Sequence, residues 1–133
     1  NGSCYRSKAF RKACKRLGLT HIRTRPYTPK TNGKAERFIQ TALREAGAFA
    51  TVIHGSVYQE AGLPDLSCVY RGRALWIEVK LPGEKPSTAQ VVMRARLERA
   101  GAVCVVATSV EEAIDALSEI DARIRSERRR VAA

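Results

Sequence analysis

The sequence predicts an α/β domain in which a helix, three strands, a helix, a strand and a final helix follow one another from about residue 34. Three observations predict this order. Apolar residues recur at helical spacing before and after a β-prone middle section. Arg71-Gly72 separates two β-prone runs by a tight turn, and Ser87 and Ser109 each begin a capping box ahead of a helical pattern. A basic helix, a short strand and a loop precede this core, and 133 residues leave room for one domain with such an appendage.

The appendage and the first core helix have the pattern of amphipathic helices. The basic first helix ends at Gly18, and its apolar stripe consists of Phe10, Ala13, Cys14 and Leu17. Residues 19–24 predict a short strand, and residues 25–33 predict a loop because they are rich in Pro, Gly and Asn. The next helix is predicted over residues 34–46, ends at Gly47 and buries Phe38, Ile39, Ala42 and Leu43.

The middle of the chain predicts strands over residues 49–54, 65–70 and 73–81, the last two joined as a hairpin. Ser87 and Gln90 then form a capping box that opens a helix, which runs to Ala100.

The last part of the chain predicts one strand and one helix. Residues 103–107 form an unbroken apolar run, as expected of a strand covered on both faces. Ser109 and Glu112 predict a second capping box before a helix that buries Val110, Ala113, Ile114 and Leu117. Residues 122–133 are predicted to be a frayed basic tail, with Arg123, Arg125, Arg128, Arg129 and Arg130.

The hairpin turn fixes which side chains face each other. If Arg71-Gly72 is the turn, Tyr70 pairs with Arg73, and counting outward places Asp65 opposite Glu78. Because side chains alternate along a strand, Glu78 and Lys80 share one face, while the other face presents Leu75, Ile77 and Val79 to the core.

Composition favours a polyanionic partner such as DNA. The net charge is +11, and residues 1–50 alone carry +10. No stretch approaches the roughly 20 apolar residues of a membrane span, so we expect a cytoplasmic protein without membrane contact. Cys4, Cys14, Cys68 and Cys104 lack CxxC spacing and are expected to be structural thiols rather than zinc ligands or disulfides. Because the chain begins at Asn1 and has only one internal methionine, it is expected to be a fragment or the product of a broken gene.

The predicted pairing of Asp65 with Glu78 suggests a site for a divalent cation. Like charges directly opposed on a ribbon are destabilising unless they are neutralised, and a divalent cation would neutralise them. Mg²⁺ typically takes one or two carboxylates and polarises both a phosphate and a bound water, which suits phosphodiester hydrolysis. Lys80 could orient or help deprotonate that water. The alternative is a solvent-facing strand on which Lys80 merely pairs with Glu78 or Asp65.

Two short motifs resemble a known superfamily. Gly62-Leu63-Pro64-Asp65 and Trp76-Ile77-Glu78-Val79-Lys80, followed by a helix that carries Gln90, resemble the restriction-endonuclease-like superfamily and most closely its VRR-NUC branch. The resemblance covers about residues 34–120 and implies an αβββαβ core. It also implies that Asp65 and Glu78 hold Mg²⁺ or Mn²⁺, that Lys80 serves the attacking water, and that Gln90 lies near the active site. Gln90 has an equally good structural interpretation as the capping partner of Ser87.

The VRR-NUC resemblance has three further implications. The family places an acidic residue on its first core helix, and Glu36 matches it best, which makes Glu36 a third candidate metal ligand. An exposed glutamate near a helix N-terminus is the alternative. His54 and Tyr58 are candidate DNA contacts, although both also suit a plain loop, and no acidic neighbour is predicted for His54. Small members of the branch tend to form homodimers.

Residues 1–45 resemble a different family. Asn1-Gly2-Ser3, Thr24-Arg25-Pro26-Tyr27 and the run from Pro29 to Phe38 are similar to the closing part of a DDE integrase-type transposase domain, which has an RNase H-like fold. That resemblance implies that Glu36 is the last of three metal-binding carboxylates and that DNA contacts come from Arg25, Tyr27, Lys30 and Lys34. The first two acids are missing, so transposition is not expected. We therefore predict a transposase remnant over residues 1–45 and a nuclease domain over 34–121 that share the helix 34–46.

Three functions remain open from the sequence. The first is a metal-dependent DNA nuclease of the VRR-NUC type with a basic N-terminal remnant. The second is a non-catalytic DNA-binding protein, which the charge of residues 1–50 favours. The third is a degenerate integrase or transposase fragment.

Overall fold

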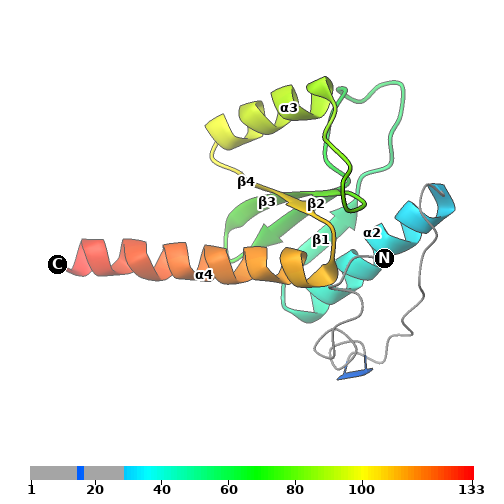
Figure 1. Ribbon diagram of the computed structural model, residues 1–133. Helices are drawn as coiled ribbons and strands as arrows, with labels where there is room; N and C mark the ends of the chain where they lie inside the picture. Colours follow the sequence, from blue (N-terminus) through cyan, green and yellow to red (C-terminus); the bar gives the residue numbers. More distant parts are fainter. Residues whose placement is uncertain (1–14, 17–28) are drawn as a thin grey trace.

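The structure is a computed structural model that describes residues 15–16 and 29–133 (Figure 1). Its elements follow the predicted order: α2 (Pro29–Glu45), β1 (Phe49–Val52), β2 (Leu66–Tyr70), β3 (Arg73–Val79), α3 (Thr88–Arg99), β4 (Val103–Ala107) and α4 (Val110–Ala132). Of residues 1–28, only Lys15 and Arg16 are described, and both are helical and exposed. The remaining predictions for residues 1–28 lie outside the described residues.

The four strands form one sheet in the order β1-β2-β3-β4. The first two pairings are antiparallel, and β3 pairs with β4 in parallel through the crossover helix α3. Figure 1 shows α3 on one side of the sheet, with α2 and α4 on the other. Strand β4 contacts both α3 and α4, which confirms that it is covered on both faces.

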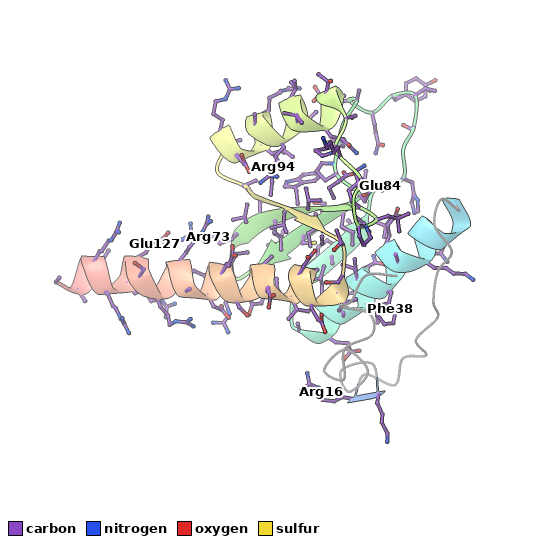
Figure 2. The ribbon with its side chains drawn as sticks, viewed as in Figure 1. Arg16, Phe38, Arg73, Glu84, Arg94 and Glu127 are labelled. Atoms are coloured by element: carbon purple, nitrogen blue, oxygen red, sulfur yellow. The ribbon has the colours of Figure 1, made fainter. Side chains whose placement is uncertain are left out.

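The hydrophobic core lies between the sheet and the pair α2 and α4. Alternate residues of β3, Leu75 and Ile77, are fully buried there, as predicted. The buried side of α2 consists of Ile39, Ala42 and Leu43, with Phe38 half-buried at the edge of the core. Figure 2 shows the side chain of Phe38 on α2, beneath α4. This core holds β3 in place and leaves its other face for α3.

The hairpin has the predicted register. Tyr70 pairs with Arg73 and Leu66 with Ile77, so the next step along both strands brings Asp65 level with Glu78. Both turn residues have positive φ, 48° for Arg71 and 76° for Gly72. Such turns match the right-handed twist of the strands they connect, which fixes the pairing.

Helix α2 begins at Pro29, so the loop predicted over residues 25–33 is wrong for its last five residues. Proline is tolerated in the first turn of a helix, where its missing N–H has no intrahelical partner. Gly33 costs about 1 kcal/mol within a helix. Packing of the buried side of α2 outweighs this penalty.

The end of the chain is helical, so the predicted frayed tail over residues 122–133 is wrong. Helix α4 continues to Ala132, and its apolar stripe extends through buried Ile120 and partly buried Ile124. Asp121 accepts a hydrogen bond from Tyr70 Oη at 3.2 Å, and Glu127 forms an ion pair with Arg73 (Figure 2). The hairpin thus supports the second half of α4.

The start of α4 differs in detail from the predicted capping box. Ser109 caps the helix and accepts the N–H of Glu112 at 3.2 Å. The carboxylate of Glu112 accepts the N–H of Thr108 instead of that of Ser109. The cap is therefore extended by one residue toward β4.

The two cysteines within the described part of the chain are free and buried, Cys68 and Cys104. Burial raises the pKa of the Cys68 thiol to about 12, so this thiol is protonated and unreactive near neutral pH. Both fit the prediction of structural thiols, whereas Cys4 and Cys14 lie outside the described residues. Among the described helices, none combines the length and apolar character needed to cross a bilayer.

Candidate metal-binding and catalytic site

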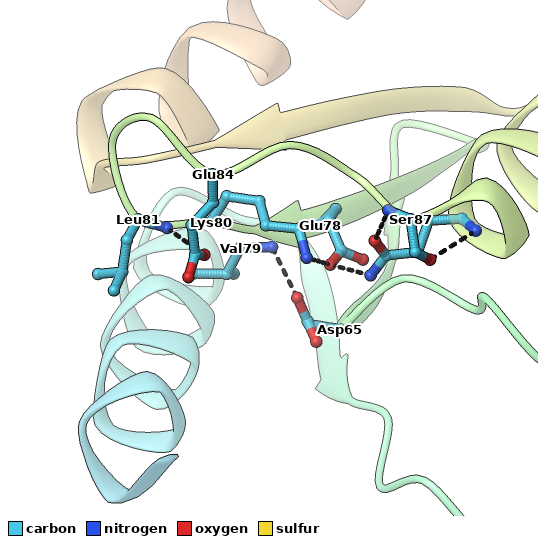
Figure 3. A network of polar contacts seen from close by, with 8 residues as sticks. Asp65, Glu78, Val79, Lys80, Leu81, Glu84 and Ser87 are labelled. Atoms are coloured by element: carbon cyan, nitrogen blue, oxygen red, sulfur yellow. Dashed lines mark hydrogen bonds and ion pairs between the residues drawn. The ribbon is translucent and has the colours of Figure 1, made fainter. Parts of the chain in front are cut away.

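Ionisable side chains gather where β3 ends, beside the start of β2 and the first turn of α3 (Figure 3). Asp65 directly precedes β2, Glu78 is the penultimate residue of β3, and Lys80 follows the strand. Gln90 lies in the first turn of α3. The fold therefore brings together the four residues that the sequence singled out.

Asp65 is held between two strands. Its Oδ2 accepts the backbone N–H of Val79 at 2.7 Å (Figure 3). Its carbonyl oxygen accepts the N–H of Ile53 at 2.7 Å. A carboxylate anchored through one oxygen to the last residue of β3 lies close to Glu78. Burial raises the pKa of Asp65, while the Val79 N–H and the charge of Lys80 oppose the rise.

Glu78 is a buried carboxylate, 7% exposed, with two differently placed oxygens. Its Oε1 lies 2.9 Å from Lys80 Nζ and accepts a hydrogen bond from Gln90 Nε2 at 2.5 Å. Its Oε2 is buried and has no hydrogen-bond partner among the described residues. Burial raises the pKa of Glu78, Lys80 opposes the rise, and the charge of Asp65 adds to it.

Lys80 is placed by backbone contacts beyond the end of β3. Its N–H donates to Ala107 O at 3.0 Å, which extends the pairing with β4 by one bond. The following loop is closed by Glu84, whose carboxylate accepts the N–H of Leu81 at 3.0 Å (Figure 3). The Lys80 side chain is 17% exposed, so its ammonium group is held against Glu78 instead of extending into solvent.

Gln90 lies where both interpretations of it place this residue: it belongs to the capping box, and it lies beside Glu78. Its Oε1 accepts the N–H of Ser87 at 2.8 Å, and its own N–H donates to Ser87 Oγ at 3.2 Å, which completes the capping box. Because the cap occupies the amide oxygen, the amide nitrogen faces Glu78. The cap therefore fixes the orientation of the Gln90 amide toward the carboxylate pair.

Glu36 lies within electrostatic reach of Asp65. Burial raises the pKa of Glu36, the charge of Asp65 raises it further, and His54 lowers it. Across residues 15–16 and 29–133, no three His, Cys, Asp or Glu side chains are close enough together to hold one metal ion. The prediction that His54 has no acidic neighbour is wrong, because Glu36 on α2 lies close enough for His54 to lower the pKa of its carboxyl.

The candidate DNA contacts that the structure describes are exposed. Lys34 lies on α2, and His54 and Tyr58 lie in the loop between β1 and β2. Hydrogen bonds between Ser56 and Gln59 form a turn that leaves Tyr58 95% exposed. Lys30 lies in the first turn of α2, and Arg25 and Tyr27 lie outside the described residues.

The carboxylate pair has the character of a divalent-cation site. Mg²⁺ usually takes one or two protein carboxylates and keeps several waters, and Asp65 and Glu78 supply two. A buried carboxylate oxygen without a partner, such as Glu78 Oε2, is costly unless a cation or donor satisfies it. The alternative of a solvent-facing strand is wrong because Glu78 is buried, although its pairing with Lys80 is present.

Sequence reasoning missed two supports of the site, the N–H of Val79 and the carboxylate of Glu84. A backbone donor leaves no signal in residue identity. Glu84 lies in a Pro-Gly loop, where a charged residue is unremarkable.

The raised pKa values predict how stability depends on pH. Both carboxyls have pKa values above their ordinary 3.8 and 4.5, so within the interval up to the raised values the folded state binds more protons than the unfolded chain. Stability in EDTA should therefore fall as pH rises through this interval. Denaturant unfolding across about pH 4 to 8 should show a shallower fall for Asp65→Asn than for the wild type. If the free energy of unfolding depended on pH equally in both proteins, Asp65 and Glu78 would not destabilise each other. Added Mg²⁺ should reduce the loss of stability that the wild type shows as pH rises.

Gly62 is predicted to be essential for the position of α3. Its φ is +84°, and a Cβ at this position would lie 2.3 Å from Ala89 O in the first turn of α3. Gly62→Ala should lower the free energy of unfolding by about 2 kcal/mol or more, since a strained backbone costs roughly 1–3 kcal/mol before the clash is counted. Gly72→Ala is the control, because Gly72 also has positive φ but nothing lies near its Cβ position. Equal losses of stability in denaturant unfolding would rule out the clash.

Comparisons with known proteins bear on the fold. No protein-family model matches the chain, and no curated protein matches it significantly. A solved structure described as "VRR_NUC domain" superimposes with a TM-score of 0.54 at 24% identity, over 66% of this chain and 94% of that one. The structure of Archaeoglobus fulgidus Hjc, a Holliday junction resolvase, gives a TM-score of 0.47 at 27% identity, over 56% of this chain and 64% of that one.

The resemblance of residues 1–45 to an integrase stays a prediction, because no family model matches the chain. Within that segment, α2 is a helix of the αβββαβ core. The chain therefore has a restriction-endonuclease-like fold similar to that of a VRR_NUC domain.

Proposed function

We propose that this protein is a metal-dependent nuclease that hydrolyses phosphodiester bonds in DNA, with Asp65 and Glu78 as ligands of Mg²⁺ or Mn²⁺. The observation that carries the proposal is the buried Oε2 of Glu78 beside Asp65, which has no hydrogen-bond partner within residues 15–16 and 29–133, with the Lys80 ammonium group 2.9 Å from the other oxygen of Glu78. A structural ion pair between Glu78 and Lys80 would not need a second, half-buried carboxylate at this place.

Each residue of the site has a role in this proposal. A bound divalent cation supplies Lewis acidity, which polarises the phosphate and lowers the pKa of a bound water. Asp65 is oriented by the Val79 N–H, and Glu78 is oriented by Gln90, so the ligand geometry is fixed before substrate binds. Lys80 orients the attacking water and stabilises the hydroxide formed from it, because its ammonium group donates hydrogen bonds and accepts none. Glu36 contributes negative charge nearby rather than direct ligation.

DNA would approach along the exposed loop between β1 and β2. His54 and Tyr58 lie on this loop, and Lys34 lies on the exposed side of α2. Residues 51–121 carry a net charge of −3, so the phosphate affinity would come from the basic residues 1–50 and the arginines of α4. A homodimer, which the VRR-NUC resemblance implies, is part of the same proposal and is measurable by light scattering.

The test is cleavage by the purified chain. Single-stranded, duplex, flapped and four-way-branched DNA are each incubated with Mg²⁺, Mn²⁺ or EDTA. We expect cleavage of at least one substrate with either metal, none in EDTA, and recovery when excess Mg²⁺ is restored. The absence of cleavage with every substrate and metal would overturn the proposal.

A non-catalytic DNA-binding function is the second candidate, favoured by the net charge of +10 in residues 1–50. It predicts affinity that falls steeply with salt, is unchanged by Asp65→Asn and is not accompanied by cleavage.

A further inference from the structure

A cavity of about 330 Å³ lies between α3 and the face of the sheet that α3 covers. Its floor includes Trp76 of β3 and Cys104 of β4, its sides include Pro64 and Pro86, and α3 contributes Val91 and Arg94. These walls are mostly apolar. The volume lies near the lower end of the roughly 300–1,000 Å³ of ligand pockets, which suits a single ring system rather than a nucleic acid helix.

The cavity and the candidate catalytic site share two residues. Glu78 and Gln90 line the cavity and also belong to the carboxylate cluster. Trp76 precedes Glu78 by two residues, so both side chains lie on the same face of β3. Anything held against the Trp76 ring is therefore close to the proposed point of cleavage.

The chemistry of the walls selects the kind of occupant. Phosphate does not suit a cavity lined mostly by apolar side chains and by two acids, because the one cation among its described lining residues, Arg94, already pairs with Glu98. A flat aromatic ring with a polar edge does, because Trp76 and the prolines offer stacking surfaces. Among the lining residues, Gln90 has a second amide N–H besides the one given to Glu78. Arg94, labelled on α3 in Figure 2, pairs with Glu98 and reaches toward Cys104 O, and its guanidinium group has further N–H donors.

We infer that this cavity receives one unstacked nucleobase of the DNA strand that is cut. The inference rests on the proposed nuclease function and narrows its substrate to DNA with an unpaired nucleotide beside the scissile phosphate. A base within a continuous duplex would first have to leave its stack and its partner, which disfavours it as an occupant. Stacking on an aromatic side chain is tolerant of base identity, so the preference is for unpaired structure rather than for a sequence.

Trp76 is the only tryptophan of the chain, so its fluorescence reports directly on the cavity. Asp65→Asn protein, which should not cut, is titrated in Mg²⁺ with a short single-stranded oligonucleotide of mixed sequence and with the same sequence fully paired. We expect the single strand to quench Trp76 fluorescence and the duplex not to do so at equal occupancy, measured separately by anisotropy.

Two neighbouring valines provide a matched pair for cleavage assays. Val91 and Val92 are exposed to nearly the same extent, 53% and 55%, but only Val91 lines the cavity. Val91→Phe should fill it and reduce cleavage of DNA with unpaired nucleotides roughly tenfold or more, whereas Val92→Phe should not. Ala95→Met, at a second lining position on α3, should behave like Val91→Phe and covers the case in which one variant folds poorly.

The outcomes separate the inference from the function on which it rests. If the wild type cuts DNA but bound single strands leave Trp76 fluorescence unchanged, the inference is wrong and the nuclease function stands. Equal cleavage by the Val91, Ala95 and Val92 variants would likewise overturn it. If no DNA is cut, the proposed function fails, while selective quenching by single strands would still identify the cavity as a nucleobase site.

Discussion

Asp65→Asn is expected to abolish cleavage while leaving the protein folded. The amide oxygen can still accept the Val79 N–H, so the anchor at 2.7 Å is conserved while the charge is lost. Losing a metal ligand removes several kcal/mol of transition-state stabilisation, and about 4 kcal/mol corresponds to roughly a thousandfold in rate. Single-turnover cleavage in saturating Mg²⁺ measures this loss.

The thermal shift caused by Mg²⁺ tests the same change without catalysis. A ligand at a hundred times its Kd stabilises the folded state by about 2.7 kcal/mol. We expect the wild type to be stabilised by Mg²⁺ and Asp65→Asn to lose most of this effect. In EDTA near neutral pH the variant should be at least as stable as the wild type, because burial raises the pKa of Asp65 and its charge is unfavourable there.

Asp121→Asn is the control for this variant. Asp121 is also a largely buried carboxylate, but it pairs with Arg71 and Tyr70 at the opposite end of the hairpin. It should retain both cleavage and the Mg²⁺ shift. Equal losses in the two variants would mean that the Asp65 effect is a general loss of stability, and full activity of Asp65→Asn would exclude it as a ligand.

The centre of the site was predictable because it depends on local geometry. The turn at Arg71-Gly72 sets the register of the hairpin, and alternation along β3 then determines which side chains share a face. Asp65, Glu78 and Lys80 follow from these two rules. Gln90 was placed by its capping box, which fixes the start of α3 within one residue.

Features that depend on long-range packing were not predictable from local patterns. The extent of α4 rests on contacts of Asp121 and Glu127 with the hairpin, and a run of arginines alone resembles a tail. The proximity of Glu36 to His54 depends on how α2 lies against the chain that follows β1. The cavity beneath α3 is lined by five separate segments of the chain, so local patterns do not predict it. The alternation along β3 does predict that Trp76 lies on the same face as Glu78.

The cluster of charged residues contributes less to the stability of the fold than apolar residues could at the same place, which argues for a functional origin. Two carboxyls with raised pKa values, buried Glu78 and half-buried Asp65, lie near a single ammonium group, and one Glu78 oxygen has no partner among the described residues. Replacing a buried ion pair by apolar residues is often neutral or stabilising, so stability alone gives no reason to keep this arrangement. Binding of a cation would give such a reason.

Lys80→Met is expected to separate catalysis from metal binding. Methionine keeps the apolar stem but removes the ammonium group that lies 2.9 Å from Glu78 Oε1, so cleavage should fall roughly 10²- to 10³-fold, as for loss of a donor that stabilises developing negative charge. The Mg²⁺ thermal shift should persist or grow, because a competing positive charge is gone. Lys85→Met, at an exposed position of the following loop, should change neither. Loss of the Mg²⁺ shift in Lys80→Met would assign Lys80 to the support of Glu78 rather than to the attacking water.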